Sequence, residues 1–152
     1  MRHRTNPASG AALRAAQIHP PWPGADRTMN TLAAADHSPR IRDAALADIT
    51  RIAEIYARYV RTSVATFEET PADAVEIAAR FHRVTTLGVP WIVIEDAAGV
   101  QGYAYAGPFR DRSAYRFSVE DSIYIDVDHL RCGYGMRLLS ELISRCEALG
   151  KR

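Results

Sequence analysis

Lysine is nearly absent from this chain of 152 residues, since it occurs only at position 151 and 18 of the 19 basic residues are arginine. The net charge is +1, so the chain lacks the excess of positive charge that would attract nucleic acid or a membrane surface. It also has no apolar run near the roughly 18 residues that a membrane span requires. We therefore expect no nucleic-acid or membrane partner. Hydrophobic content of 47% with 24% charged residues is typical of a globular protein.

Cysteine is scarce as well, with only Cys132 and Cys146. They form no Cys-x-x-Cys motif, and no histidine or cysteine stands beside them at the spacing of metal ligands. We therefore expect no metal site. Reduced thiols and a cytoplasmic location are the expectation for such a chain.

Residues 1–40 are rich in alanine, proline, glycine and arginine and show no hydrophobic periodicity. Such a segment cannot bury much apolar surface, so we predict that it is disordered. It lacks the apolar core of a secretory signal, although its few acids and several arginines faintly suggest a transit peptide. We favour a simpler interpretation, in which translation starts at Met29 and residues 1–28 are an extension.

Ordered structure is expected from Ile41 onward as a single domain, residues 41–152. The second of its helices is predicted to begin at Pro71 and end at Gly88, with an apolar face of Val75, Ala78, Ala79, Phe81 and Val84. Periodicity and turn residues predict the other elements: a strand at 41–44, a helix at 46–61, strands at 91–94, 100–106 and 117–126, and a helix at 136–149. This order predicts an α/β fold.

The last predicted helix ends at Leu149-Gly150, and only Lys151 and Arg152 follow in the sequence. A helix that crosses over a sheet normally leads into a parallel strand beside the strand that preceded it. No such strand follows here, so we expect a domain that is incomplete at its C-terminus. We also expect an unpaired edge along the 117–126 strand, which favours low stability and association.

The loop after this strand carries the sequence Gly133-Tyr134-Gly135 and opens the last helix. The first amides of a helix have no intrahelical partner and attract anions, and glycine lets the backbone approach a phosphate closely. Glu120, upstream on the strand, could handle a proton beside whatever the phosphates anchor. The order of these elements predicts a phosphate site beside an acid.

Less specific interpretations of the same residues remain. Two glycines can form an ordinary strand-to-helix turn, and Glu120 can be a strand carboxylate in a salt bridge. A Walker loop is excluded because Gly-Lys-Ser/Thr is absent, and a dinucleotide fingerprint is excluded because Leu138 stands where the third glycine would be.

Five segments, spread over residues 41–152, match one known family. They are IRDAALADITRIAEIY, TFEETP, GYAYAGPFRDR, AYRFSVEDSIYIDVDH and the GYG helix start. On these segments the chain resembles the phosphinothricin and methionine-sulfoximine N-acetyltransferases of the GNAT superfamily. The resemblance implies a mixed sheet flanked by helices, whose fourth and fifth strands splay apart. It also implies transfer of an acetyl group from acetyl-CoA to the primary amine of a small amino-acid-like substrate.

The resemblance also implies roles for individual residues. Glu120 would be the general base. Three residues of the strand would pair through their backbone with the pantetheine arm: Ile123, Tyr124 and Ile125. The pyrophosphate would be held by the amides of Arg131, Cys132, Gly133, Tyr134, Gly135 and Met136. The substrate pocket would be lined by Arg110, Asp111, Arg112, Glu120, Asp121 and Ser122.

Residue chemistry fits these roles. An arginine such as Arg110 or Arg112 suits a carboxylate or phosphinate, because its donors match two oxygens at once. No covalent intermediate is needed, so Cys132 is not required as a nucleophile. Members of the family usually form dimers, so a homodimer is compatible with the resemblance.

Two departures from the family pattern stand out. Leu130 occupies the position where the family has glutamine or arginine, three residues before the first glycine. The family's later strands, with an asparagine or tyrosine near the thioester sulfur, have no counterpart in the sequence. The alternative function is therefore an inactive GNAT remnant that binds CoA weakly or serves as an interaction module.

Overall fold

A four-stranded sheet forms the centre of the computed structural model, which describes residues 38–152. The strands are β1 (Arg40–Asp43), β2 (Trp91–Asp96), β3 (Gly99–Pro108) and β4 (Val119–Ile125). They lie in the order β1-β2-β3-β4 and each neighbouring pair is antiparallel. The disorder predicted for residues 1–40 and the start proposed at Met29 fall almost entirely outside the described residues.

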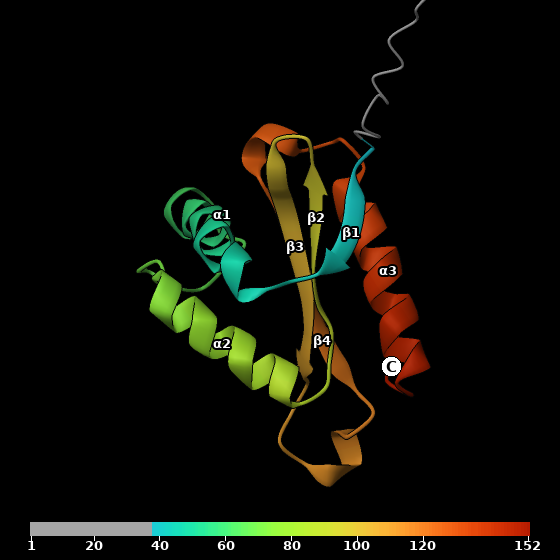
Figure 1. Ribbon diagram of the computed structural model, residues 1–152. Coiled ribbons are helices and arrows are strands. Elements are labelled where there is room, and N and C mark those ends of the chain that lie inside the picture. The colour runs from blue at the N-terminus through green and yellow to red at the C-terminus, as the bar shows by residue number, and fades with distance from the viewer. Residues whose placement is uncertain (1–37) are drawn as a thin grey trace, which may run out of the picture. The chain divides into compact units, whose positions relative to one another are not determined.

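Helices cover both faces of this sheet. The helices α1 (Ile49–Thr62) and α2 (Ala74–Thr86) lie on one face, and α3 (Tyr134–Ala148) lies on the other (Figure 1). The predicted order of strands and helices is confirmed. The parallel component of the expected mixed sheet is limited, in the described residues, to Arg152: its amide donates to the carbonyl of Phe117 and its carbonyl accepts from Val119, which is a parallel pattern.

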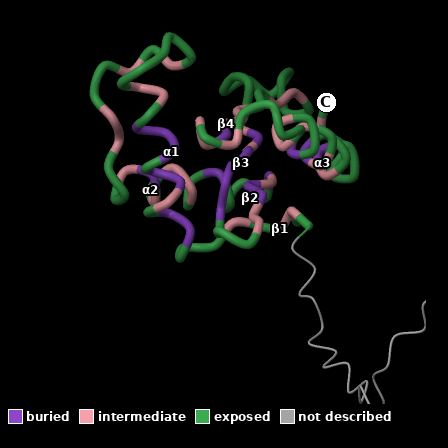
Figure 2. The backbone as a smooth tube through the Cα atoms, turned by 90° about the horizontal axis from the view of Figure 1, so that it is seen from above, coloured by how far each residue is buried: buried purple, intermediate pink, exposed green. Residues whose placement is uncertain are grey.

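Two apolar layers hold the helices to the sheet, because side chains alternate between the faces of a strand. Toward α1 and α2, an aromatic row runs across the strands, with Trp91 stacked on Tyr105 at 4.3 Å and Tyr103 on Tyr124 at 5.3 Å between ring centroids. Toward α3, the opposite faces of the strands meet Leu138 and Leu142, which are 0% and 1% exposed. Burial is accordingly concentrated in the strands and in the helix faces turned toward them (Figure 2).

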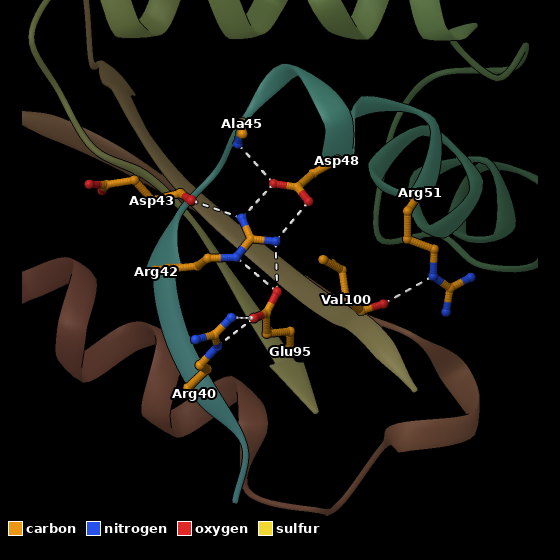
Figure 3. Close-up of polar contacts among 8 residues, drawn as sticks. All are labelled: Arg40, Arg42, Asp43, Ala45, Asp48, Arg51, Glu95 and Val100. Carbon is orange, nitrogen blue, oxygen red and sulfur yellow. Dashed lines mark hydrogen bonds and ion pairs between the residues drawn. The ribbon is translucent and has the colours of Figure 1, made fainter. Parts of the chain in front are cut away.

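An ion-pair cluster fixes the start of α1 against the sheet (Figure 3). Arg42 donates from both terminal nitrogens to the two carboxylate oxygens of Asp48 at 2.7 and 2.8 Å, and from Nε to Glu95 at 2.8 Å. Asp48 also accepts from the amide of Ala45 at 2.8 Å. Because Asp48 is only 8% exposed, this pairing compensates a charge that would otherwise be buried alone.

The apolar face predicted for α2 was partly wrong. Val75 is 78% exposed and Ala79 is also exposed, whereas Ile77 and Val84 are buried. The helix starts at Ala74 rather than at Pro71, with Asp73 as its N-cap accepting from the amide of Glu76 at 2.8 Å. Since residues two apart on a helix point about 200° apart, burial of Ile77 turns both Val75 and Ala79 to solvent.

Gly102 sets how closely β3 and β4 approach. A Cβ atom at Gly102 would lie 2.6 Å from Cδ1 of Ile125 and 3.0 Å from the carbonyl oxygen of Tyr124. We expect Gly102→Ala to lower the free energy of unfolding by about 1–3 kcal/mol, because β4 must shift. Urea denaturation measures this, with Gly107→Ala in the same strand as the control, since a Cβ there meets nothing within 4 Å. Equal stability of the two variants would show that β4 adapts without strain.

Candidate active site

Alternation along β4 divides its side chains between two environments. Glu120, Ser122 and Tyr124 share the face toward α1, where the Tyr124 ring lies edge-on to Tyr56 and Tyr59 at 5.2 and 5.3 Å. Burial raises the pKa of Tyr124 to about 12, so its hydroxyl stays protonated near neutral pH. Of the three residues, Glu120 therefore carries the group suited to accepting a proton.

An open cavity of about 560 Å³ lies between β4 and the loop that joins α1 to α2. Its lining comes from the two elements and from one tyrosine of α1: Tyr59, Ala65, Thr66, Phe67, Glu68, Glu120, Asp121, Ser122, Ile123 and Tyr124. The side chain of Glu120, an exposed residue, has no hydrogen bond or ion pair within residues 38–152, so the alternative salt bridge is not formed there. Its carboxylate is free to meet a ligand in this cavity.

Polar contacts hold the loop wall of this cavity in place. Thr66 Oγ1 lies 3.2 Å from the hydroxyl of Tyr56 and accepts from the amide of Glu68 at 3.1 Å. Glu68 in turn accepts from Arg80 of α2 at 2.8 Å. The TFEETP segment, which the sequence marked through the family resemblance, therefore supplies part of the cavity lining, including Phe67.

Arg110, Asp111 and Arg112 lie in the exposed loop between β3 and β4. The guanidinium of Arg110 lies over the ring of Phe109, 5.0 Å from its centroid, and lines a separate cavity of about 230 Å³. None of these three residues lines the cavity of Glu120, whereas Asp121 and Ser122 do. The structure thus brings together half of the predicted substrate residues.

The outer edge of β4 presents unpaired backbone next to this cavity. Val119 directs its amide outward to Arg152, whereas Asp126 directs its amide to Gln101 of β3. Alternation therefore turns the amides and carbonyls of Ile123 and Ile125 outward, and the carbonyl of Ile125 accepts from the Tyr59 hydroxyl at 2.6 Å. The backbone of Tyr124 faces Tyr103 in β3, so its predicted pairing with a ligand is less favourable than that of its two neighbours.

Where the loop after β4 meets α3, several backbone amides have no acceptor within the helix. Gly133, the N-cap of α3, has φ of 79°, a left-handed conformation that suits glycine, and it provides no side-chain cap. The first bond of the helix runs from the amide of Arg137 to the carbonyl of Gly133 at 3.2 Å. The amides of Tyr134, Gly135 and Met136 therefore have no intrahelical acceptor, and the helix dipole favours an anion beside them. Arg131 also has a positive φ of 64°, which tightens the loop.

In the described part of the chain, no group of three or more His, Cys, Asp or Glu side chains is placed to hold a metal ion. Within residues 38–152, no helix is both long and apolar enough to cross a membrane.

No family model matches the chain. It is 49% identical over 100 residues to the phosphinothricin N-acetyltransferase of Alcaligenes faecalis, covering 66% of this chain and 51% of that protein. It is 40% identical over 114 residues to the L-methionine sulfoximine/L-methionine sulfone acetyltransferase of Pseudomonas aeruginosa, covering 74% of this chain and 66% of that protein. A crystal structure of a GNAT superfamily phosphinothricin acetyltransferase from Sinorhizobium meliloti, in complex with acetyl-CoA, matches with a TM-score of 0.71 and 51% identity, covering 73% of this chain and 60% of that one.

The chain belongs to the GNAT superfamily, in its phosphinothricin acetyltransferase-like group. The family that the sequence resembles and the predicted α/β fold class are thereby confirmed. This GNAT domain spans about half to two thirds of the length of the relatives that it matches. What those relatives do as whole proteins is therefore a starting point for a proposal about this chain.

Proposed function

We propose that this GNAT domain binds acetyl-CoA and transfers its acetyl group to the primary amine of a small amino-acid-like substrate, of the phosphinothricin or methionine sulfoximine type. The observation that carries the proposal is the succession of an exposed acid, an open strand edge and a row of free helix amides. Glu120, the outward backbone of Ile123 and Ile125, and the amides of residues 134–136 follow one another along the chain. The names of the relatives supply the reaction class.

The spacing of these three features fits an extended ligand. Glu120 and Ile125 are five residues apart in β4, which is about 17 Å at 3.3–3.4 Å per residue. An anion held at the mouth of α3 is thus far from the acid, and the strand edge between them can bond to a chain of amides. We propose that the pyrophosphate lies at residues 131–136 and that the pantetheine arm follows Ile123 and Ile125 toward Glu120.

Glu120 would act as the general base. An α-amine has a pKa of about 8 and is mostly protonated at pH 7, and only the free amine attacks a thioester. A carboxylate within reach, directly or through one water, can remove this proton. The thioester supplies an activated acyl group, so the chain needs only to bind, to orient and to accept the proton.

The proposed substrate clamp requires two arginines to move toward the cavity of Glu120. Arg110 and Arg112 suit a carboxylate or phosphinate, but they lie outside the cavity of Glu120. Their proposed role requires the loop at residues 109–116 to approach β4, or a second copy of the chain to contribute it. The homodimer expected from the family belongs to this proposal.

Calorimetric titration with CoA tests the binding half of the proposal. We expect the chain to bind CoA, and we expect added inorganic pyrophosphate to compete, because the free amides of α3 recognise the diphosphate. Raising the salt concentration should weaken the pyrophosphate competition more than CoA binding, since the strand edge contributes neutral bonds to CoA alone. No heat at millimolar CoA would contradict the proposal.

A second candidate function is a domain that binds CoA weakly, or acts as an interaction module, without catalysis. The observation that favours it is the outer edge of β4, where no strand lies beside residues 120–125 in the described part of the chain. Binding of CoA without acetylation of phosphinothricin or methionine sulfoximine in a mass-spectrometric assay would select this function over the first.

A further inference from the structure

The tip of the β2–β3 hairpin lies against the mouth of α3, although about 38 residues separate them in sequence. The hydroxyl of Tyr134, the first residue of α3, donates to Oδ2 of Asp96 at 3.1 Å. The imidazole of His129 stacks on the Tyr134 ring, with centroids 6.1 Å apart and planes 13° apart, and its Nε2 lies 3.8 Å from the same oxygen of Asp96. The carboxylate of Asp96 thus lies close to His129, early in the loop, and to Tyr134, where the loop joins the helix.

Asp96 is itself held rigidly. Its Oδ1 accepts from the amide of Ala98 and from the side chain of Gln101, each at 2.9 Å. Gln101 is only 2% exposed, and its carbonyl accepts from the amide of Asp126 at 2.7 Å. The bond from Gln101, with help from Ala98 and Tyr134, holds the pKa of Asp96 below its usual range, so Asp96 is ionised near neutral pH.

The beginning of the loop is anchored to the same hairpin from a second direction. Asp126 pairs with Arg51 of α1 and accepts from the amide of Asp128 at 2.9 Å. Arg51 also donates to the carbonyl of Val100, next to Gln101, at 3.0 Å. The segment from Asp126 to Tyr134 is therefore held at its start by Asp126 and at its end by Asp96.

We propose that Asp96, acting through Tyr134, is a positioning residue that sets the first-turn amides of α3 for the diphosphate of CoA. Tyr134 lies between the two glycines whose backbone forms the anion site, and glycine on either side offers no side-chain packing to hold that backbone. The bond from the Tyr134 hydroxyl to an ionised, rigid acceptor supplies the constraint that the glycines lack. The inference rests on the proposed function and extends it from the residues that touch the cofactor to those that hold them.

The test compares Tyr134→Phe with Tyr115→Phe, a partly exposed tyrosine in the loop between β3 and β4 whose hydroxyl has no hydrogen bond within residues 38–152. For Tyr134→Phe we expect the Kd for CoA, measured by calorimetry, to rise about five- to tenfold, which corresponds to the typical net contribution of one hydrogen bond. The KM for acetyl-CoA should rise with it while kcat at saturation stays within about twofold. Tyr115→Phe should match wild type in the Kd for CoA and in the KM for acetyl-CoA, because its loop lies outside the proposed CoA site. An unchanged Kd for Tyr134→Phe would overturn the inference.

Amide hydrogen exchange, measured without CoA, tests this inference separately from the proposed function. In Tyr134→Phe, amide hydrogen exchange at Arg137 and Leu138, whose bonds close the first turn, should accelerate about five- to tenfold, while exchange in β3 stays unchanged. Acceleration in a chain that binds no CoA would support the positioning role and overturn the proposed function. Unchanged exchange in a chain that binds CoA would overturn the positioning role alone. Asp96→Ala should reproduce the acceleration at Arg137 and Leu138 and should add acceleration at Ala98, whose amide also donates to Asp96. Uniform acceleration throughout the chain would indicate a general loss of stability and would contradict the positioning role.

Discussion

Replacement of Glu120 by glutamine is expected to reduce turnover of amine acetylation by a factor on the order of 10² or more. Glutamine has nearly the same shape but cannot accept a proton, so the attacking amine keeps the proton that blocks it. The Kd for CoA should not change, because Glu120 lies about 17 Å along β4 from Ile125, at the end away from the proposed diphosphate site. Steady-state kinetics with phosphinothricin and calorimetry with CoA measure the two quantities separately.

The dependence of this defect on pH distinguishes a base from a structural carboxylate. As the pH rises from 7 to 9, the amine loses its proton to solvent, since its pKa is about 8. The ratio of wild-type to Glu120→Gln turnover should therefore fall over this range. Glu147→Gln is the matched control, because Glu147 is exposed on α3 and lies outside the cavity of Glu120. Equal turnover of Glu120→Gln and wild type would remove Glu120 from the mechanism.

The order of the elements could be predicted because hydrophobic period and turn residues both mark it. Trp91-Ile-Val-Ile94 is an apolar run bounded by Pro90 and by the turn after Asp96, and it forms a strand that is buried on both faces. Strand limits were less predictable: β3 begins at Gly99 and ends at Pro108, one to two residues beyond the expected range at each end. Glycine and proline mark a turn, but hydrogen bonding to neighbouring strands decides where pairing stops.

The face of α2 could not be predicted from its own sequence. Apolar residues spread over more than half of the circumference of this helix, so periodicity alone admits more than one buried face. The ring of Phe81 lies edge-on to Trp91 of β2 at 5.5 Å, and this contact helps to fix the rotation of the helix. That information lies in the sheet, not in residues 74–86.

The proposed anion loop and the proposed acid could be picked out from the sequence, because each depends on the order of residues along one segment. The cavity could not, because its two walls come from residues 65–68 and 120–124, which only the fold brings together. The contact between Asp96 and Tyr134 is of the same kind. In the sequence, Asp96 lies only between two predicted strands, and Tyr134 is only the middle residue of a glycine motif.

Replacement of Arg42 by alanine is expected to lower the free energy of unfolding by about 3 kcal/mol at pH 7. Arg42 neutralises Asp48, whose side chain is 9% exposed, and also pairs with Glu95. Without it, Asp48 keeps only the amide of Ala45 and Glu95 keeps only Arg40. The value lies at the low end for buried ion pairs because the Arg42 side chain itself is 33% exposed. Urea denaturation measures the change.

Arg40→Ala is the matched control, because Arg40 lies in the same strand and pairs with the same Glu95 but is 74% exposed. We expect it to cost less than about 1 kcal/mol, as is usual for surface ion pairs. A comparable loss in both variants would show that charge alone, rather than burial of Asp48, is responsible.

The stability difference should also depend on pH. The hydrogen bonds from Arg42 hold the pKa of Asp48 below its usual range, so in wild type their stabilisation is present above pH ~4 and is lost as the pH falls through the folded pKa. In Arg42→Ala, burial without a cation should raise the pKa of Asp48, so that protonation on acidification stabilises the folded state. The two effects have opposite signs, so the difference in the free energy of unfolding between wild type and Arg42→Ala should narrow from about 3 kcal/mol at pH 7. The narrowing should begin at the raised pKa of Asp48 in the variant, above pH ~4, and should continue below pH ~4 as wild type loses its own stabilisation. A gap that stays constant from pH 7 to pH 3 would show that Arg42 acts through packing of its aliphatic stem and not through the charge of Asp48.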